Sequence, residues 1–185
     1  MGGIEIAAAL LGVINVVLVV RRSTWNYPFG IAMVSLYFFV FRDAKLYSDA
    51  LLQIFFLLIQ IYGWWAWAHA DRVDHGVTVG WMRWKQRILW LAGMTVAILV
   101  WSAGMARYTD AAAPLADGTI AGLSVAAQIL QSFRRVESWV LWIAVDALAI
   151  GVFAWRGLWV TSALYCLFLV LATIGFIEWR RKAQA

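Results

Sequence analysis

Long hydrophobic stretches separated by short polar segments occupy almost the whole chain. Most of these stretches approach the ~20 residues that a helix needs to cross the hydrocarbon core of a bilayer. They cover residues 4–20, 27–41, 46–68, 88–106, 117–133, 139–155 and 158–179. The pattern predicts an all-α membrane protein with seven transmembrane helices and almost no soluble part.

Composition supports this fold class, and charge adds an orientation. The 185 residues are 64% hydrophobic and 14% charged, which is unlike a soluble globular domain. One side of the predicted membrane holds eleven basic residues, at 21, 22, 72, 83, 85, 87, 134, 135, 180, 181 and 182. The other side holds four, at 42, 45, 107 and 156. The positive-inside rule then places the C-terminus in the cytoplasm and the N-terminus outside. Because the charges are spread over short loops, they do not indicate nucleic-acid binding.

The second part of the chain repeats the first. A basic pair that leads into a helix and a tryptophan occurs at 21–25 and again at 134–139. Residues 45–47 return as 157–159, and residues 63–67 return as 175–179. The offset is 114 residues at the first pair and 112 at the other two, which indicates a short gap within the second helix.

The repeat predicts how the chain is divided. The two copies start four helices apart, an even number, so both enter the membrane with the same polarity. Parallel repeats of this kind occur in transporters, where the substrate lies between the halves. We therefore expect a three-helix bundle at 1–68, a cytoplasmic loop, linker helix and outer loop at 69–116, and a second three-helix bundle at 117–185.

One acidic residue lies deep in a hydrophobic stretch. Asp146 follows Trp139 and Trp142 at spacings of seven and four, so at ~100° per residue the three side chains share one helix face. A carboxylate at membrane depth costs at least ~2.5 kcal/mol and is expected to face a polar cavity or a partner. Tryptophan rings attract cations and stack on flat rings. The combination predicts a pocket for a flat, positively charged small molecule.

Buried amides extend this candidate site. Gln53 and Gln60 are seven residues apart on the third stretch, Trp64 follows them, and Gln128 lies on the fifth. A side-chain amide in hydrocarbon needs a partner, which is either another helix or a ligand. The pattern leaves both readings open. No spacing resembles a metal site, a nucleophile–base pair or a phosphate-binding loop, so we expect no enzyme, no metal and no cofactor.

Three motifs together resemble the PnuC vitamin transporters. They are the run 62–67, Tyr-Gly-Trp-Trp-Ala-Trp; the run 139–146, Trp-x-x-Trp-x-x-x-Asp; and the two joints between a basic pair and tryptophan. The resemblance covers nearly the whole chain outside the loops around the fourth helix. It implies a three-plus-one-plus-three helix arrangement similar to the SWEET fold. It also implies facilitated diffusion of a nicotinamide riboside-type vitamin, which a cytoplasmic kinase then traps.

Alternatives remain for the substrate and for the class of protein. Thiamine is also a flat cation, so the aromatic and acidic residues do not separate it from nicotinamide riboside. A retinal photoreceptor is excluded, because Lys45, Lys85 and Lys182 all lie at or beyond helix ends. A membrane scaffold without substrate is the remaining alternative, against which the repeat and Asp146 argue. The expected partners are the vitamin and the lipid bilayer, with no nucleic acid, and a homo-oligomer stays open.

Overall fold

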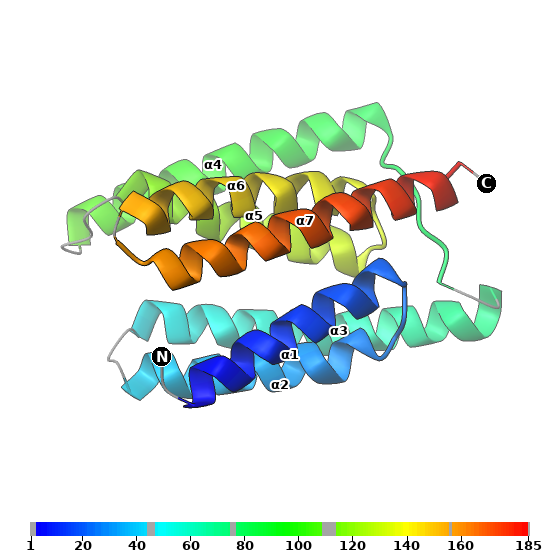
Figure 1. The fold of residues 1–185 in the computed structure, drawn as a ribbon. Coiled ribbons are helices and arrows are strands. Elements are labelled where there is room, and N and C mark those ends of the chain that lie inside the picture. Colours follow the sequence, from blue (N-terminus) through cyan, green and yellow to red (C-terminus); the bar gives the residue numbers. More distant parts are fainter. Residues whose placement is uncertain (1–2, 44–46, 75–76, 109–113, 156, 185) are drawn as a thin grey trace.

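The computed structural model describes residues 3–43, 47–74, 77–108, 114–155 and 157–184. Within them the chain forms seven helices joined by short segments (Figure 1). The helices are α1 (Gly3–Val20), α2 (Asn26–Asp43), α3 (Tyr47–Asp74), α4 (Trp84–Tyr108), α5 (Pro114–Ser132), α6 (Glu137–Trp155) and α7 (Trp159–Lys182). The all-helical fold class predicted from the hydrophobic pattern is confirmed.

The largest boundary error concerns the end of α3. The predicted stretch ended at residue 68, whereas α3 continues to Asp74. Hydrophobicity marks where a helix leaves the bilayer, and a charged segment without glycine or proline continues the same helix into water. The segment that joins α3 to α4 is therefore shorter than the sequence suggested. Proline at the first position of α5 fits its preference for helix starts.

Five of the described helices are long and apolar enough to cross a membrane by length and composition: α1, the 50–70 part of α3, α4, α6 and α7. The two that fall short are α2 and α5. These helices carry polar residues that point into the protein, among them buried Asn26 on α2 and buried Gln128 and Gln131 on α5. A membrane-spanning position for α2 and α5 stays a prediction, which their packing between the apolar helices supports.

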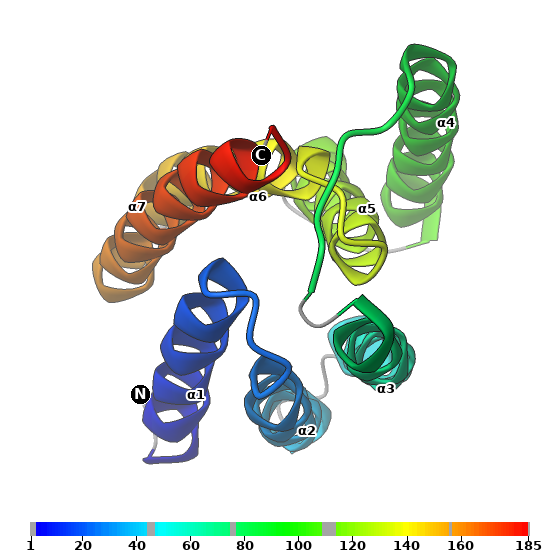
Figure 2. The ribbon, with the colours of Figure 1, turned by 90° about the vertical axis from the view of Figure 1, so that its right-hand side faces the viewer.

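Six helices pack in a closed ring. Around the ring the order is α1, α2, α3, α5, α6 and α7, and α7 returns to α1 (Figure 2). Among the described helices, α4 packs only against α5, and it lies outside the ring. The order is unchanged when α1–α3, the first half, is exchanged with α5–α7, the second half. Two three-helix repeats and a linker helix predict this arrangement.

The turns that end α1 and α5 have the same backbone geometry. Arg22 and Arg134, which are 112 residues apart, have φ values of 56° and 60°. Two backbone hydrogen bonds recur in both turns. Arg22 N–H donates to Val19 at 2.8 Å, as Arg134 N–H does to Gln131 at 2.9 Å. Ser23 N–H donates to Leu18, as Arg135 N–H does to Leu130, both at 2.9 Å. The offset of 114 at this joint is therefore wrong. The counterpart of Trp139 is Tyr27 rather than Trp25, and no gap is needed in the second helix.

Candidate functional site

The predicted face of α6 points into the protein. Trp139 and Asp146 are buried, with 1% and 4% of their surfaces exposed, and Trp142 between them is half-buried. Trp139 packs edge-to-face on Trp179, with ring centroids 5.5 Å apart at 88°. Its ring also lies where a side chain at Gly175 would be, 2.6 Å from a Cβ built there. The surroundings of Trp139 are those of a core residue, while Trp142 and Asp146 lie nearer the middle of α6.

Trp142 is held by a residue that was not selected from the sequence. Its indole N–H donates to Oε1 of Gln131 on α5, at 2.8 Å. Gln131 is itself buried near the end of α5. In the sequence Gln131 lies three residues after Gln128, and nothing there indicates which helix its side chain meets. The hydrogen bond fixes the plane of the Trp142 ring relative to α5.

Gln60 meets two residues of the first half at a glycine. A Cβ built on Gly30 would lie 2.5 Å from Nε2 of Gln60 and 2.8 Å from Nδ2 of Asn15. Only glycine leaves this space for the two amides. Asn15 donates to the carbonyl oxygen of Asn26 at 2.7 Å. The Oε1 atom of Gln60 is buried and has no hydrogen-bond partner among the described residues.

The same positions in the second half have the opposite chemistry. At the offset of 112 residues, Gly30 corresponds to Trp142, Asn15 to Ala127 and Gln60 to Ala172. Both alanines are buried. The first half therefore presents amides around a glycine, and the second presents a tryptophan beside alanines. An interior between the two halves would have a polar wall on one side and an aromatic wall on the other.

The remaining predicted site residues are dispersed. Gln128 is buried near the end of α5, and its Nε2 atom has no hydrogen-bond partner among the described residues. Gln53 is half-buried on α3, on the same face as Gln60. Trp64 is 43% exposed and lies on the flank of that face. No contact joins Gln53 or Trp64 to the α6 residues in the described part of the chain, so the structure does not bring all seven candidates together.

Asp146 lies near a phenol, and no cation accompanies it among the described residues. Tyr165 of α7 interacts electrostatically with Asp146 and with Tyr37 of α2. Tyr165 stacks on Phe153 at a centroid distance of 5.3 Å. Within the described residues, no lysine or arginine forms an ion pair with Asp146, and nothing donates a hydrogen bond to its carboxylate. A buried carboxylate without a cationic partner is costly, so it is suited to a ligand that brings the positive charge.

Two tryptophans tie the halves together at the end where α3 and α7 finish. Trp67 of α3 donates its indole N–H to the carbonyl oxygen of Gln131 at 3.3 Å. Trp179 of α7 donates in the same way to Val19 of α1 at 3.2 Å. The two donor tryptophans are 112 residues apart in the sequence, and so are the two acceptor residues. Each half therefore donates to the carbonyl oxygen at the corresponding position of the other half.

The segment 77–83 closes the same end. Val77 is buried in the core cluster with Trp67 and Trp179, and its carbonyl oxygen accepts from Arg22 at 2.9 Å. Gly80 donates its N–H to Arg134 and accepts from the N–H of residue 136, each at 3.1 Å. The segment thus bonds to the α1–α2 turn and to the α5–α6 turn.

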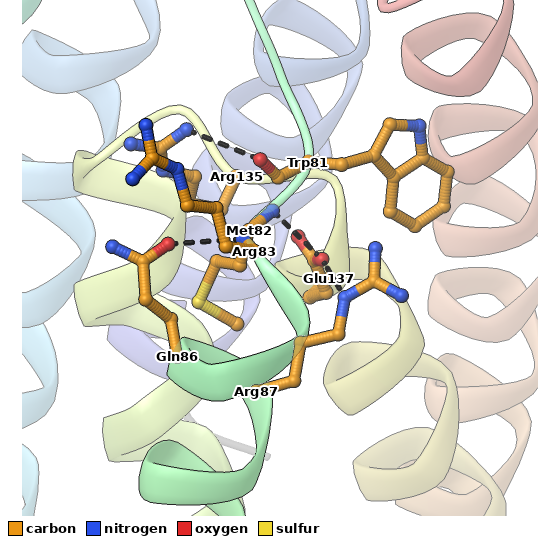
Figure 3. Close-up of polar contacts among 7 residues, drawn as sticks. All are labelled: Trp81, Met82, Arg83, Gln86, Arg87, Arg135 and Glu137. Atoms are coloured by element: carbon orange, nitrogen blue, oxygen red, sulfur yellow. Dashed lines mark hydrogen bonds and ion pairs between the residues drawn. The ribbon is translucent and has the colours of Figure 1, made fainter.

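Glu137, at the start of α6, connects this segment to α6. One carboxylate oxygen accepts from the backbone N–H of Met82 at 2.9 Å and from Nε of Arg87 at 2.7 Å (Figure 3). The guanidinium of Arg87 lies over the ring of Trp81, 5.2 Å from its centroid. The start of α4 is therefore fixed to the start of α6.

A ring of apolar helices with amides and a carboxylate inside is typical of an integral membrane transporter. The chain belongs to the nicotinamide mononucleotide transporter family, which it matches over residues 2–181. The resemblance predicted from the motifs is confirmed, and so is the expectation that the protein is not an enzyme.

The curated relatives that this chain resembles in sequence are named as vitamin transporters. The chain is 26% identical over 206 residues to the nicotinamide riboside transporter PnuC of Escherichia coli (strain K12), covering 98% of this chain and 86% of the relative. It is 29% identical over 196 residues to PnuC of Neisseria mucosa, covering 96% of this chain and 72% of the relative. It is also 24% identical over 183 residues to the riboflavin/roseoflavin transporter RibM of Streptomyces davaonensis, covering 97% and 85%.

A solved structure agrees with the fold. The crystal structure of the vitamin B3 transporter PnuC superposes with a TM-score of 0.78 at 27% sequence identity. The match covers 98% of this chain and 82% of that one. Together with the apolar helices, the family and this structure make the chain a multi-pass membrane transporter for a small molecule.

Proposed function

We propose that the protein takes up nicotinamide riboside by facilitated diffusion. The observation that carries this proposal is Asp146, buried in the helix ring without a cationic partner among the described residues, one turn from the aromatic face of Trp142. Nicotinamide riboside is a flat pyridinium cation that carries a carboxamide and a ribose. Each part has a counterpart: a carboxylate for the charge, a tryptophan for the ring, and amides for the carboxamide and hydroxyl groups.

The unpaired amide atoms support the same substrate. Oε1 of Gln60 is an acceptor, and Nε2 of Gln128 is a donor, each buried without a partner in the described residues. An unsatisfied buried polar atom costs about 1–3 kcal/mol, and a ligand with donors and acceptors removes that cost. A carboxamide supplies one of each. In this proposal the substrate lies between the amides of the first half and the Trp142 wall of the second.

Thiamine is the second candidate, and one relative indicates a third. Thiamine carries a flat cationic ring, so it would satisfy Asp146 and Trp142 equally well. The Streptomyces davaonensis relative is named for riboflavin and roseoflavin. Riboflavin is flat but uncharged, and it would leave Asp146 buried without a counter-ion. The carboxylate therefore favours a cationic vitamin over a flavin for this chain.

The closure of one end of the ring supports alternating access. The crossed tryptophan hydrogen bonds and segment 77–83 close the end of the ring at which α3 and α7 finish. The other end has no equivalent crossed pair among the described residues. We propose that the two halves are parallel repeats that rock about the central site, so that this closure breaks when the other end closes.

Transport should need no ion gradient. Within the described residues, Asp146 is the acidic group deepest in the ring, and no histidine accompanies it, whereas proton-coupled carriers usually use several intramembrane titratable groups. Net uptake would then depend on a cytoplasmic kinase that phosphorylates the substrate. The distribution of basic residues supports a cytoplasmic location for the closed end and for the end of α7. The start of α1 lies at the opposite end of the bundle (Figure 1).

Uptake into proteoliposomes tests the proposal. Vesicles that contain the protein and an enclosed nicotinamide riboside kinase with ATP should accumulate labelled product with no proton or sodium gradient. Empty vesicles, and vesicles without the kinase, are the controls. Strict dependence on an imposed gradient would exclude uniport, and no uptake of nicotinamide riboside alongside uptake of thiamine would replace the substrate.

A further inference from the structure

A second cavity lies outside the helix ring. It has a volume of about 370 Å³ and is formed by residues of α3, the start of α4, and the end of α5 with its following turn. Both α3 and α4 pack against α5, but they do not pack against each other in the described structure. The helices α3 and α4 lie on different sides of α5 (Figure 2), and residues of all three line the cavity, which we call the cleft.

Positive charge gathers at one end of the cleft. Arg134 and Arg135, from the α5–α6 turn, both line it, and both are half-buried. The described hydrogen bond of the Arg135 side chain is a long one, 3.4 Å from Nη1 to the carbonyl oxygen of Trp81. A guanidinium has five N–H donors, so most of those on Arg135 remain for a ligand.

The acidic residue next to this turn does not neutralise the cleft. Glu137 is paired with Arg87 at 2.7 Å. Gln86, which lines the cleft, and the Arg87–Glu137 pair lie on different sides of the first turn of α4 (Figure 3). The cleft is therefore lined by Arg135, most of whose N–H donors are open, by the amide of Gln86, and by the charge of Arg134, which also contacts Thr78. Guanidinium groups suit a phosphate group.

The rest of the cleft resembles a membrane interface. Tyr62 of α3 and Trp90 of α4 line its walls, and such aromatic residues are enriched at headgroup level. Along the same helices, Leu58 and Ile61 of α3 and Leu91 of α4 are exposed aliphatic side chains. A molecule with a phosphate at one end and hydrocarbon at the other would match both parts of this surface.

We propose that the cleft binds the headgroup of an anionic phospholipid, such as phosphatidylglycerol or cardiolipin. The phosphate would contact Arg134 and Arg135 at the membrane surface, and the acyl chains would run between α3 and α4. Basic pockets between transmembrane helices are known to bind such headgroups. A lipid fits better than a soluble phosphate because α3 and α4, which supply two of the cleft's walls, are both long and apolar enough to cross a membrane. This site is separate from the proposed vitamin site.

Native mass spectrometry of the full-length protein tests the assignment. The protein would be presented with equal amounts of phosphatidylglycerol, cardiolipin and phosphatidylethanolamine. We expect the anionic lipids to bind at least about tenfold more tightly than the zwitterionic one, since each basic residue near the surface contributes roughly a fivefold gain. Arg135→Gln should lose about fivefold for the anionic lipids alone. Ala66→Leu fills the cleft without changing charge, and it should lower binding too.

A matched control and a competition arm decide the outcome. Arg180→Gln with Arg181→Gln removes two charges from exposed positions of α7 at the same end of the bundle, outside the cleft, and should leave lipid affinity unchanged. An equal loss in this control, or equal affinity for the zwitterionic lipid, would overturn the proposal. So would displacement of the bound lipid by millimolar inorganic phosphate, which would identify a site for soluble anions.

Discussion

Trp67 and Trp179 lie against each other, with ring centroids 5.8 Å apart at 46°, and each donates its indole N–H to a backbone carbonyl of the opposite half. Each also packs edge-to-face on a partner from its own half: Tyr27 at 5.4 Å and Trp139 at 5.5 Å. The two tryptophans therefore connect the two halves at one end of the ring, through one hydrogen bond in each direction. That end is where a change between two conformations would be seen first.

Trp179→Phe should loosen this end. The substitution keeps an aromatic ring but removes the N–H that binds the Val19 carbonyl, at a cost of about 0.5–1.5 kcal/mol. The closed form should then lose roughly 2–12-fold in population. Maleimide labelling of Val77→Cys, with the single native Cys166 replaced by serine, reports how often the end opens. Labelling should be faster in the Trp179→Phe variant.

The control for this labelling experiment is Trp25→Phe. Trp25 lies near the same end of the bundle and is 68% exposed, so its change removes a tryptophan without touching the closure. Identical labelling rates in the Trp179→Phe, Trp25→Phe and parent proteins would contradict the role given to the crossed hydrogen bonds.

Gly175→Ala should lower thermal stability. A Cβ at this position would lie 2.6 Å from the Trp139 ring, which is buried and has no room to move. Overpacking of this kind typically costs about 1–3 kcal/mol. Gly151→Ala in α6 is the matched change, because a Cβ there meets nothing within 4 Å and alanine is the better helix former. A melting curve of the purified protein should separate the two variants, and equal melting temperatures would refute the packing argument.

The helices could be predicted from the sequence, but not how they meet. Hydrophobic stretches located all seven within a few residues, because a membrane helix must be apolar over a nearly fixed length. The offset of 112 between Gly63 and Gly175 agrees with the offset of the two turns, whereas the offset of 114 at the first joint does not. At that joint both halves contain two consecutive arginines, so the sequence alone does not show which arginines correspond. The turn geometry shows that Arg22 corresponds to Arg134. Backbone hydrogen bonds depend little on the identity of the side chain, so the sequence does not reveal them.

Gln131→Leu should weaken substrate binding through Trp142. Its Oε1 atom accepts the indole N–H at 2.8 Å, so its loss frees the ring to turn. A double-mutant cycle measures this dependence: in a Trp142→Phe background, which has no indole N–H, Gln131→Leu should cause little further loss of affinity. Additive losses in the cycle would mean that Gln131 acts on the substrate independently of Trp142.

The candidate site was predicted in part. One-face spacing on α6 identified Trp142 and Asp146, because i, i+4 positions on a helix lie together whatever the tertiary structure. The sequence did not reveal that Gln131 holds Trp142, or that Gly30 makes room for Asn15 and Gln60. Contacts between helices depend on how each helix is rotated, and a single sequence carries little information on that rotation.

Asp146→Asn should reduce affinity for a cationic vitamin without lowering stability. A hydrogen bond to a charged group contributes about 1.5–3 kcal/mol, so the dissociation constant should rise roughly 10–150-fold. Removing a buried charge that has no cationic partner should leave the melting temperature of the ligand-free protein equal or higher. Asp43→Asn, at an exposed ion pair with Arg42, is the control and should change neither quantity. A lower melting temperature with unchanged affinity would mean that Asp146 only fastens helices together.

The central claim is that Trp142 and Asp146 hold a flat cationic vitamin inside the helix ring. Titration calorimetry of the purified protein against nicotinamide riboside, thiamine and riboflavin tests it most directly. The account predicts one site per chain for nicotinamide riboside, no binding of uncharged riboflavin, and a loss of about tenfold or more in Trp142→Ala, from desolvated ring contacts of about 0.5–2 kcal/mol each. Binding of riboflavin without nicotinamide riboside, or unchanged affinity in Trp142→Ala, would contradict it.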